Sequence, residues 1–442
     1  MIARLRRWAR SKGGQLVRRW GLLPGGVPDG IGDDAKLVGT RLDARVLVYF
    51  SGTARNLYQL RQWYAPLVEL DRHEPVVLVC GDSRVGRILR AEAPLPVLTV
   101  GRFATIDELM TRSDVAMFAY VGHESPNFQM LRVQSALHVY LSHGESDKRV
   151  SVTNQVKAYD YCFVAGQGTI DRFDEHLLRF DTARHTKAVG RPQLDAVTSG
   201  PRTRAEGEPW TVLYAPTWEG AQGTSEYSSV ISHGPRLVAA VLADPRLRLV
   251  YRPHPRTGAN RGEFEHADLA IRALLEASDG RGHLDPERDP VASFAHADLL
   301  VCDVSAIALD WLATGRPLLV TEPVSTTTVV AKTRLLDEVP RLAVAELDGV
   351  AERIVCEVTQ DPAHDARAAL WSYYFGDRSL GSGTDRFVRA SLEVIAERDA
   401  AIASLAAGPH ETERPYETER PHETERPHET ERPHETGPEA GA

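Results

Sequence analysis

The chain has 442 residues, 42% of them hydrophobic and 26% charged, which is enough for two globular domains with extensions. Its net charge of −9 is unevenly spread: residues 409–442 hold ten Glu and four Arg, whereas residues 1–20 hold seven Arg or Lys and no acid. The body of the chain shows no basic run typical of a nucleic-acid binder, and no apolar run approaches the roughly 20 residues of a membrane-spanning helix.

The four cysteines are isolated from one another, and each lies in an apolar run: Cys80, Cys162, Cys302 and Cys356. No pair has the spacing of a metal or redox site, so we predict small core residues in a reduced compartment. The N-terminus lacks a continuous apolar h-region with a cleavage-type ending, so we expect no secretion signal.

Residues 1–40 are predicted to form a basic amphipathic extension and a linker. Two Trp among seven cations in residues 1–20 are typical of a helix lying in an anionic membrane interface. A disordered basic arm is the alternative, because Gly13 and Gly14 interrupt the helix. Residues 21–40 are rich in Gly, Pro and Asp and indicate a linker.

From Arg45 onward, short apolar runs alternate with helical stretches, which indicates parallel, doubly wound sheets. The predicted strands of a first domain (41–195) lie at 46–50, 76–80, 97–100, 115–120, 137–141 and 161–165, with a helix over 54–70. The predicted strands of a second domain (196–408) lie at 212–215, 247–251, 299–302 and 318–320. Its predicted helices lie at 230–242, 269–277, 304–314, 364–374 and 383–407.

Two such domains facing a cleft make a GT-B-like architecture, an analogy of fold that says nothing by itself about chemistry. We expect the last helix to pack back on the first domain. Residues 409–442 repeat the unit HETERP, with Pro in every unit and almost no apolar residue, so they are predicted to form a disordered tail.

The segment LSHGESDK (141–148) follows a predicted strand directly. The carboxyl ends of parallel strands are where open α/β sheets bind ligands. His143 titrates near neutrality and is a candidate general base, while Gly144 lets the backbone approach a ligand closely. Lys148 follows as a candidate residue of the cleft. A turn histidine without a role is the alternative.

The segment YRPHPRTG (251–258) follows another predicted strand. Arg252, His254 and Arg256 alternate along an extended backbone fixed by two prolines, so we predict that all three face one side and bind a diphosphate. A surface-exposed basic turn is the alternative. Before it, LYAPTWEG (213–220) places Pro216, Thr217 and Trp218 at a strand end, where they are predicted to line the cleft.

The segment ADLLVCDVSAIALDWLATGRPLLV (297–320) is predicted to form a strand, a helix and a second strand. Asp303 occupies the expected N-cap, and Ser305 falls in the first turn beside unpaired N–H groups that favour an anion. Asp310 lies about two turns further on, on the same helix face, and is predicted to accept a hydroxyl. An ordinary capped core helix is the alternative.

Taken together, LSHGESDK, GRPQLD (190–195), LYAPTWEG, YRPHP and CDVSAIALDW resemble the CDP-glycerol glycerophosphotransferase family in order and spacing, as does YYFGDRSLGSGTDRF (373–387). The resemblance implies that His143 and His254 are the catalytic histidines. It also implies that the donor diphosphate lies near Asp303 and Ser305. Glu145 and Ser146 depart from the family pattern, which has Thr-Pro after His-Gly.

The resemblance implies transfer of glycerol phosphate from CDP-glycerol to a hydroxyl of a lipid-linked or polymer acceptor, with release of CMP, in teichoic acid-like synthesis. A peripheral position on the inner face of the cell membrane is expected. No sequence feature requires a metal or a cofactor beyond the donor substrate. The alternatives are a sugar-nucleotide glycosyltransferase, another polyol-phosphate transferase, or a non-catalytic membrane-associated envelope scaffold.

Overall fold

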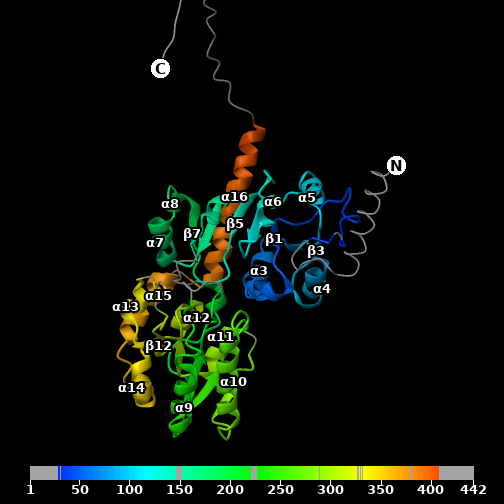
Figure 1. The fold of residues 1–442 in the computed structure, drawn as a ribbon. Coiled ribbons are helices and arrows are strands. Elements are labelled where there is room, and N and C mark those ends of the chain that lie inside the picture. The colour runs from blue at the N-terminus through cyan, green and yellow to red at the C-terminus, as the bar shows by residue number, and fades with distance from the viewer. Residues whose placement is uncertain are drawn as a thin grey trace, which may run out of the picture.

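The computed structural model describes residues 28–29, 31–145, 152–220, 226–287, 289–325, 328, 330, 332–378 and 381–407. The predicted N-terminal helix, the HETERP repeats and Lys148 lie outside these ranges. The described residues form two parallel sheets, of seven and six strands, which lie one above the other in Figure 1.

The first sheet has the strand order β3-β2-β1-β4-β5-β6-β7, and all its neighbours pair in parallel. Its strands are β1 (Val46–Phe50), β2 (Val76–Cys80), β3 (Val97–Thr99), β4 (Met117–Tyr120), β5 (Leu137–Tyr140), β6 (Tyr161–Val164) and β7 (Thr186–Ala188). Its helices are α2 (Leu57–Arg61), α3 (Tyr64–Asp71), α4 (Ser83–Glu92), α5 (Phe103–Met110), α6 (Asn127–Met130), α7 (Gln167–His176) and α8 (Thr182–His185), with short turns η1 (Ala54–Asn56), η3 (Asn154–Ala158) and η4 (Pro192–Leu194).

The second sheet has the order β10-β9-β8-β11-β12-β13. Its strands are β8 (Trp210–Ala215), β9 (Leu247–Tyr251), β10 (Gly282–Leu284), β11 (Leu299–Cys302), β12 (Leu318–Thr321) and β13 (Arg341–Leu342). The helices that follow are α9 (Gly234–Ala243), α10 (Gly262–Glu276), α11 (Pro290–Ser293), α12 (Ala306–Trp311), α13 (Arg334–Glu338), α14 (Val350–Gln360) and α15 (His364–Phe375), with η6 (Phe294–His296), η7 (Leu312–Thr314) and η8 (Val344–Gly349).

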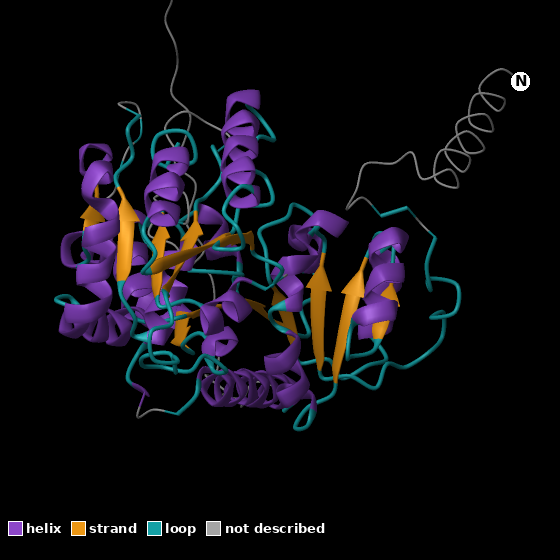
Figure 2. Cartoon of the chain, turned by 90° about the horizontal axis from the view of Figure 1, so that it is seen from below, coloured by secondary structure: helices purple, strands orange, loops and turns teal. Residues whose placement is uncertain are grey.

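The central strands are apolar along their whole length because helices cover both faces of each sheet (Figure 2). In β1, Val46, Val48 and Phe50 pack into the core on one face, whereas Leu47 and Tyr49 pack into the core on the other. This alternation is the two-residue period of a strand. The prediction of two parallel, doubly wound α/β sheets is therefore confirmed.

The long helix α16 (Gly383–Ala406) returns from the second sheet to the first (Figure 1). Its buried Phe387 packs against Trp63 and Phe163, with ring centroids 5.2 and 6.1 Å apart. Asp195 holds the start of this helix by accepting hydrogen bonds from the backbone N–H groups of Gly383 (2.8 Å) and Thr384 (2.7 Å). Two of the motifs, GRPQLD and the C-terminal one, thus meet at one point.

Three predictions of local structure are corrected. The helix expected over 54–70 is broken between α2 and α3, because the ring of Pro66 would clash with the carbonyl four residues earlier, at Gln62. The edge strands β7, β10 and β13 were not predicted, since they are short and partly exposed. Cys356 is exposed on α14, whereas the other three cysteines are buried as predicted.

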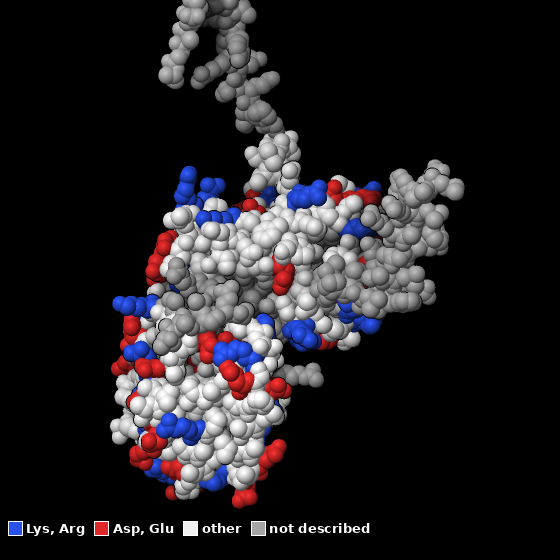
Figure 3. Space-filling model, in the orientation of Figure 1, with Lys and Arg blue, Asp and Glu red and all other residues white. Residues whose placement is uncertain are grey.

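On the face shown in Figure 3, Lys and Arg are interspersed with Asp and Glu over the described residues. Among the helices of the described ranges, none combines the length and the hydropathy that a membrane span requires.

Candidate active site

His143 lies on a tight turn just beyond β5. Ser142 adopts a left-handed backbone conformation (φ 61°), which turns the chain sharply at this point. The Nδ1 atom of His143 lies 2.9 Å from the carbonyl oxygen of Val121. A carbonyl only accepts, so Nδ1 carries the hydrogen, and Nε2 keeps its lone pair in the neutral ring. Nε2 lies 3.4 Å from the side-chain amide nitrogen of Gln59.

Burial lowers the pKa of His143, and the positive charge of Arg191 lowers it further, while the hydrogen bond to Val121 opposes both effects. The imidazole is therefore neutral at physiological pH. A half-buried neutral imidazole with a lone pair on Nε2 is suited to take a proton from a hydroxyl.

The turn that carries His143 is fixed from several directions. The indole N–H of Trp63 donates to the carbonyl of Ser142 (2.8 Å), and the amide of Gln62 donates to the carbonyl of His143 (2.6 Å). Glu145 accepts hydrogen bonds from Thr169 and Arg172, both at 2.7 Å. Glu145 thus anchors the turn to α7, which gives this departure from the family pattern a structural role.

Asp303 faces the protein interior. Its side chain is fully buried and accepts hydrogen bonds from the backbone N–H groups of Thr217 (2.7 Å) and Ser229 (3.2 Å) and from the hydroxyl of Thr321 (2.6 Å). Burial raises the pKa of Asp303, and these hydrogen bonds oppose the rise. The carboxylate therefore supports the loops around it and has no surface to offer a ligand.

The helix predicted over 304–314 begins later, at Ala306, and Ser305 rather than Asp303 is its N-cap residue. The backbone of Ser305 is extended (φ −161°), and its hydroxyl donates to the carbonyl of Asp303 (3.1 Å). The prediction of Asp303 as the N-cap is wrong, because its carboxylate is used to bind the two neighbouring loops. Ser305 remains partly exposed at the start of α12.

The turn with His143 and the start of α12 are neighbours, although they belong to different sheets. A Cβ atom placed on Gly144 would lie 3.8 Å from Cβ of Ala306 and 3.9 Å from Nη2 of Arg191. Asp310, further along α12, forms a buried ion pair with Arg191, with Nε and Oδ1 3.1 Å apart. Asp310 is thus paired with Arg191, and its role as an acceptor for a substrate hydroxyl stays a prediction.

The segment after β9 is held against the loop after β8. Glu219, which is buried, accepts hydrogen bonds from the backbone N–H groups of Gly258 (3.0 Å) and Asn260 (2.8 Å). The guanidinium of Arg256 lies 3.8 Å from the centre of the Trp218 ring, and the ring of His254 stacks near the same Trp at 6.2 Å between centroids.

His254 has a defined tautomer, since its Nδ1 accepts the backbone N–H of Arg256 (3.1 Å). The hydrogen of the neutral ring is therefore on Nε2, which makes that atom a donor. Arg252 pairs with Asp285 (2.7 Å) and also contacts Ser293 (3.0 Å). Arg252 therefore has other neighbours than His254 and Arg256, which lie at Trp218, and the binding of a diphosphate by all three stays a prediction.

The loop 216–218 is only partly exposed. Pro216 and Thr217 are buried, and Trp218 is half-buried. Trp218 is thus the residue of this group that reaches a surface, while Thr217 binds Asp303 through its backbone.

The sequence did not predict four residues beside His143: Gln59, Gln62, His123 and Arg191. His123 follows β4 just as His143 follows β5, a signal that was readable from the sequence. It stacks on Tyr140 at 3.9 Å, and burial, with a contribution from His143, lowers the pKa of His123 to about 4. Arg191 belongs to the GRPQLD motif, but its partner Asp310 is distant in sequence.

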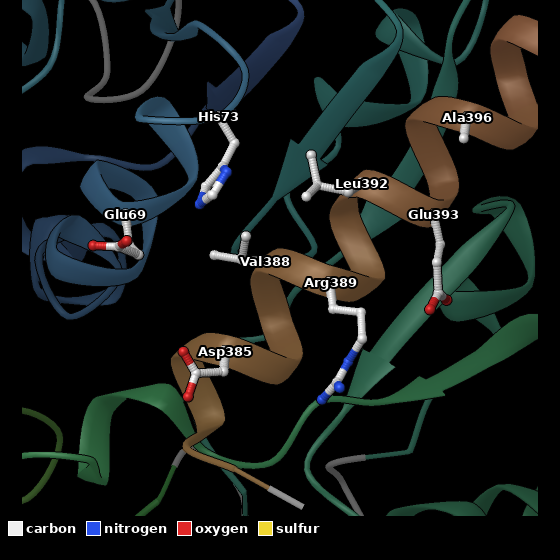
Figure 4. A pocket seen from close by; sticks show the side chains of 8 residues that line it. All are labelled: Glu69, His73, Asp385, Val388, Arg389, Leu392, Glu393 and Ala396. Atoms are coloured by element: carbon white, nitrogen blue, oxygen red, sulfur yellow. The ribbon is translucent and has the colours of Figure 1, made fainter.

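A pocket of about 430 Å³ lies elsewhere, between α3 and α16 (Figure 4). It contains none of the predicted site residues and is lined by Glu69, His73, Asp385, Val388, Arg389, Leu392, Glu393 and Ala396. Among the described residues, no group of three or more His, Cys, Asp or Glu is placed to hold a metal ion.

Comparison with solved structures defines the fold class as GT-B-like. The chain is similar to the wall teichoic acid polymerase TagF, in a histidine variant soaked with CDPG, with a TM-score of 0.54, 12% identity, and coverage of 90% of this chain and 99% of that one. TagF without substitution gives a TM-score of 0.51 at 13% identity, covering 92% and 99%. A putative UDP-N-acetylglucosamine 2-epimerase from Listeria monocytogenes gives 0.53 at 14%, covering 80% and 98%.

The family model described as CDP-Glycerol:Poly(glycerophosphate) glycerophosphotransferase matches residues 109–324, a range that includes both histidines and the start of α12. The resemblance to this family seen in the sequence motifs is therefore confirmed over residues 109–324. A search of curated proteins found no match.

Proposed function

We propose that the protein transfers glycerol phosphate from CDP-glycerol to a hydroxyl of a lipid-linked or polymer acceptor and releases CMP, in the synthesis of a teichoic acid-like polymer. The observation that carries this proposal is the neutral His143, with its Nε2 lone pair, beside the start of α12. The match to the family model and the fold shared with TagF, which has been solved after soaking with CDPG, support the choice of donor.

In the proposed reaction, the acceptor oxygen attacks the phosphorus that bears glycerol. A new P–O bond forms, the P–O bond to the CMP phosphate breaks, and the proton of the acceptor hydroxyl passes to Nε2 of His143. Such transfer depends mainly on positioning and on stabilisation of charge. No covalent intermediate with the protein is required.

The second sheet is the proposed donor side. Ser305 and the N–H groups that follow it are the proposed ligands of the diphosphate oxygens, with His254 and Arg256 neutralising the charge that gathers on CMP. Trp218 supports both of these side chains by stacking. Arg252 and Asp303 are proposed to act indirectly, by holding the loops on which these groups lie.

Replacing His254 with alanine is expected to weaken CDP-glycerol binding about 10–100-fold, because a hydrogen bond to a charged group contributes about 1.5–3 kcal/mol. Calorimetric titration of CDP-glycerol measures this change. His266, exposed on α10, supplies the matched alanine control. Unchanged affinity and turnover in His254→Ala would remove His254 from the donor site.

A sugar-nucleotide glycosyltransferase would use a similar anion site. A panel of CDP-glycerol, CDP-ribitol and UDP-sugars separates these activities, and we expect turnover with CDP-glycerol. A scaffold without catalysis would turn over none of these donors.

We also propose that the basic residues 1–20 bind the anionic inner face of the cell membrane. The full chain is expected to sediment with vesicles containing anionic lipid, and less so at high salt, whereas a chain lacking residues 1–20 remains in the supernatant. Equal sedimentation of the two chains would contradict this role.

A further inference from the structure

A buried arginine lies where the two sheets and the connection between them meet. The side chain of Arg191, which follows β7, is 8% exposed. Its Nε and Nη2 atoms lie 3.1 and 3.4 Å from the two carboxylate oxygens of Asp310 on α12. The same Nη2 donates to the side-chain oxygen of Gln62 at 3.1 Å.

Gln62 continues this network to the proposed base. Its amide nitrogen donates to the carbonyl oxygen of His143 at 2.6 Å. The backbone of Gly144, the next residue of the turn, also lies close to the guanidinium, since a Cβ at this position would lie 3.9 Å from Nη2 of Arg191. One guanidinium thus connects α12, the break between α2 and α3, and the turn that carries His143.

We propose that Arg191 is a positioning residue that couples the donor-side helix α12 to the base His143 by holding the turn through Gln62. Its fixed positive charge also adds to the effect of burial, which disfavours protonation of the imidazole. This inference rests on the proposed function. Buried charges must be paired, so Asp310 is the counter-ion that holds the guanidinium in place. A shift of α12 would then reach the His143 turn through two side chains.

The other ionisable groups described around His143 do not supply a positive charge that lowers the pKa of its imidazole. Tyr58 packs edge-on against the imidazole, and His123 is neutral near pH 7. Glu145 is paired with Arg172. Asp310 is bound to Arg191 itself, and burial raises the pKa of this carboxyl. Arg191 is the cation whose charge lowers the pKa of His143.

The test is the pH dependence of kcat/KM for CDP-glycerol in the full chain. In Arg191→Gln, the acid limb is expected to move to higher pH, because the base now keeps its proton more readily, and kcat is expected to fall about 10–100-fold through misplacement. Arg191→Lys keeps the positive charge but loses the two-pronged guanidinium. The acid limb of its pH profile is therefore expected to stay near that of the wild type. Asp310→Asn removes the negative charge that neutralises Arg191. The acid limb of this variant is therefore expected to stay in place or to move to lower pH.

Arg202→Gln is the matched control. Arg202 also pairs with a buried Asp, Asp298, which directly precedes β11. Asp298 therefore lies at the amino ends of the strands, whereas the site lies at their carboxyl ends. The loss of Arg202 is expected to leave the acid limb in place. An Arg191→Gln limb at the wild-type position, or an equal shift in Arg202→Gln, would overturn the coupling.

A second measurement separates this inference from the proposed reaction. NMR titration of the His143 ring protons reports its pKa without any turnover. If no donor reacts but the His143 pKa rises in Arg191→Gln, the reaction is wrong and the coupling stands. If CDP-glycerol reacts but the His143 pKa is unchanged, the coupling is wrong and the reaction stands.

Discussion

Turnover of CDP-glycerol is expected to fall about 10²–10⁴-fold when His143 is replaced by alanine, which is the usual contribution of a general base. The loss should appear mainly in kcat, because the proposed base acts on the acceptor proton in the transition state. Steady-state kinetics with CMP release as the readout measures the effect. The fold should survive, since the turn is anchored by Trp63 and Glu145 as well as by the imidazole.

Two controls make this result specific. Alanine at the exposed His266 is expected to leave both kcat and KM unchanged. The circular dichroism spectrum and melting temperature of His143→Ala should match those of the wild type. Normal turnover in a folded His143→Ala protein would exclude this histidine as the base.

For Asp303→Ala, the expected result is a loss of about 3 kcal/mol in the free energy of unfolding. Removing the carboxylate leaves three buried donors without an acceptor: the N–H groups of Thr217 and Ser229 and the hydroxyl of Thr321. An unsatisfied buried group costs about 1–3 kcal/mol, and the losses are not fully additive. Urea denaturation monitored by tryptophan fluorescence measures the change.

Asp348→Ala provides the comparison, since Asp348 is 91% exposed and pairs with Arg236 at the surface. Exposed ion pairs contribute about 0–1 kcal/mol. If Asp303→Ala kept the stability of the wild type but bound CDP-glycerol weakly, Asp303 would contact the donor directly, and its structural role would be wrong.

The central strands were predictable because burial on both faces imposes continuous apolar runs. β1, β2, β9 and β11 have the predicted bounds. The edge strands β7, β10 and β13 carry no such signal, since part of each is exposed and two or three residues form each of them. The break between α2 and α3 was readable from Pro66, but the apolar period over 54–70 masked it.

The positions of the candidate site were predictable, whereas the directions of its charged side chains were not. His143, Trp218 and Ser305 lie at strand ends, as expected from the pattern of strand and turn. Arg252 and Asp310 turn to partners 33 and 119 residues away in sequence, Asp285 and Arg191. Buried charges require partners, but the sequence does not show which distant residue folding will bring near.

The resemblance to the family and the physical interpretation of the residues complement each other. The motifs indicate which histidines to test and which donor to propose. The contacts in the structure then distinguish the residues proposed to bind the substrates from those proposed to support them. His143, His254, Arg256 and Ser305 are proposed to meet the substrates; Asp303, Asp310 and Arg252 are proposed to hold them in place.

The most direct test of this account is to incubate the purified full chain with CDP-glycerol and a lipid acceptor ending in a glycerol phosphate hydroxyl. We expect CMP to appear in step with an acceptor lengthened by glycerol phosphate, and the rate to fall in His143→Ala. Absence of CMP with this donor, together with turnover of a UDP-sugar, would contradict the proposed transfer.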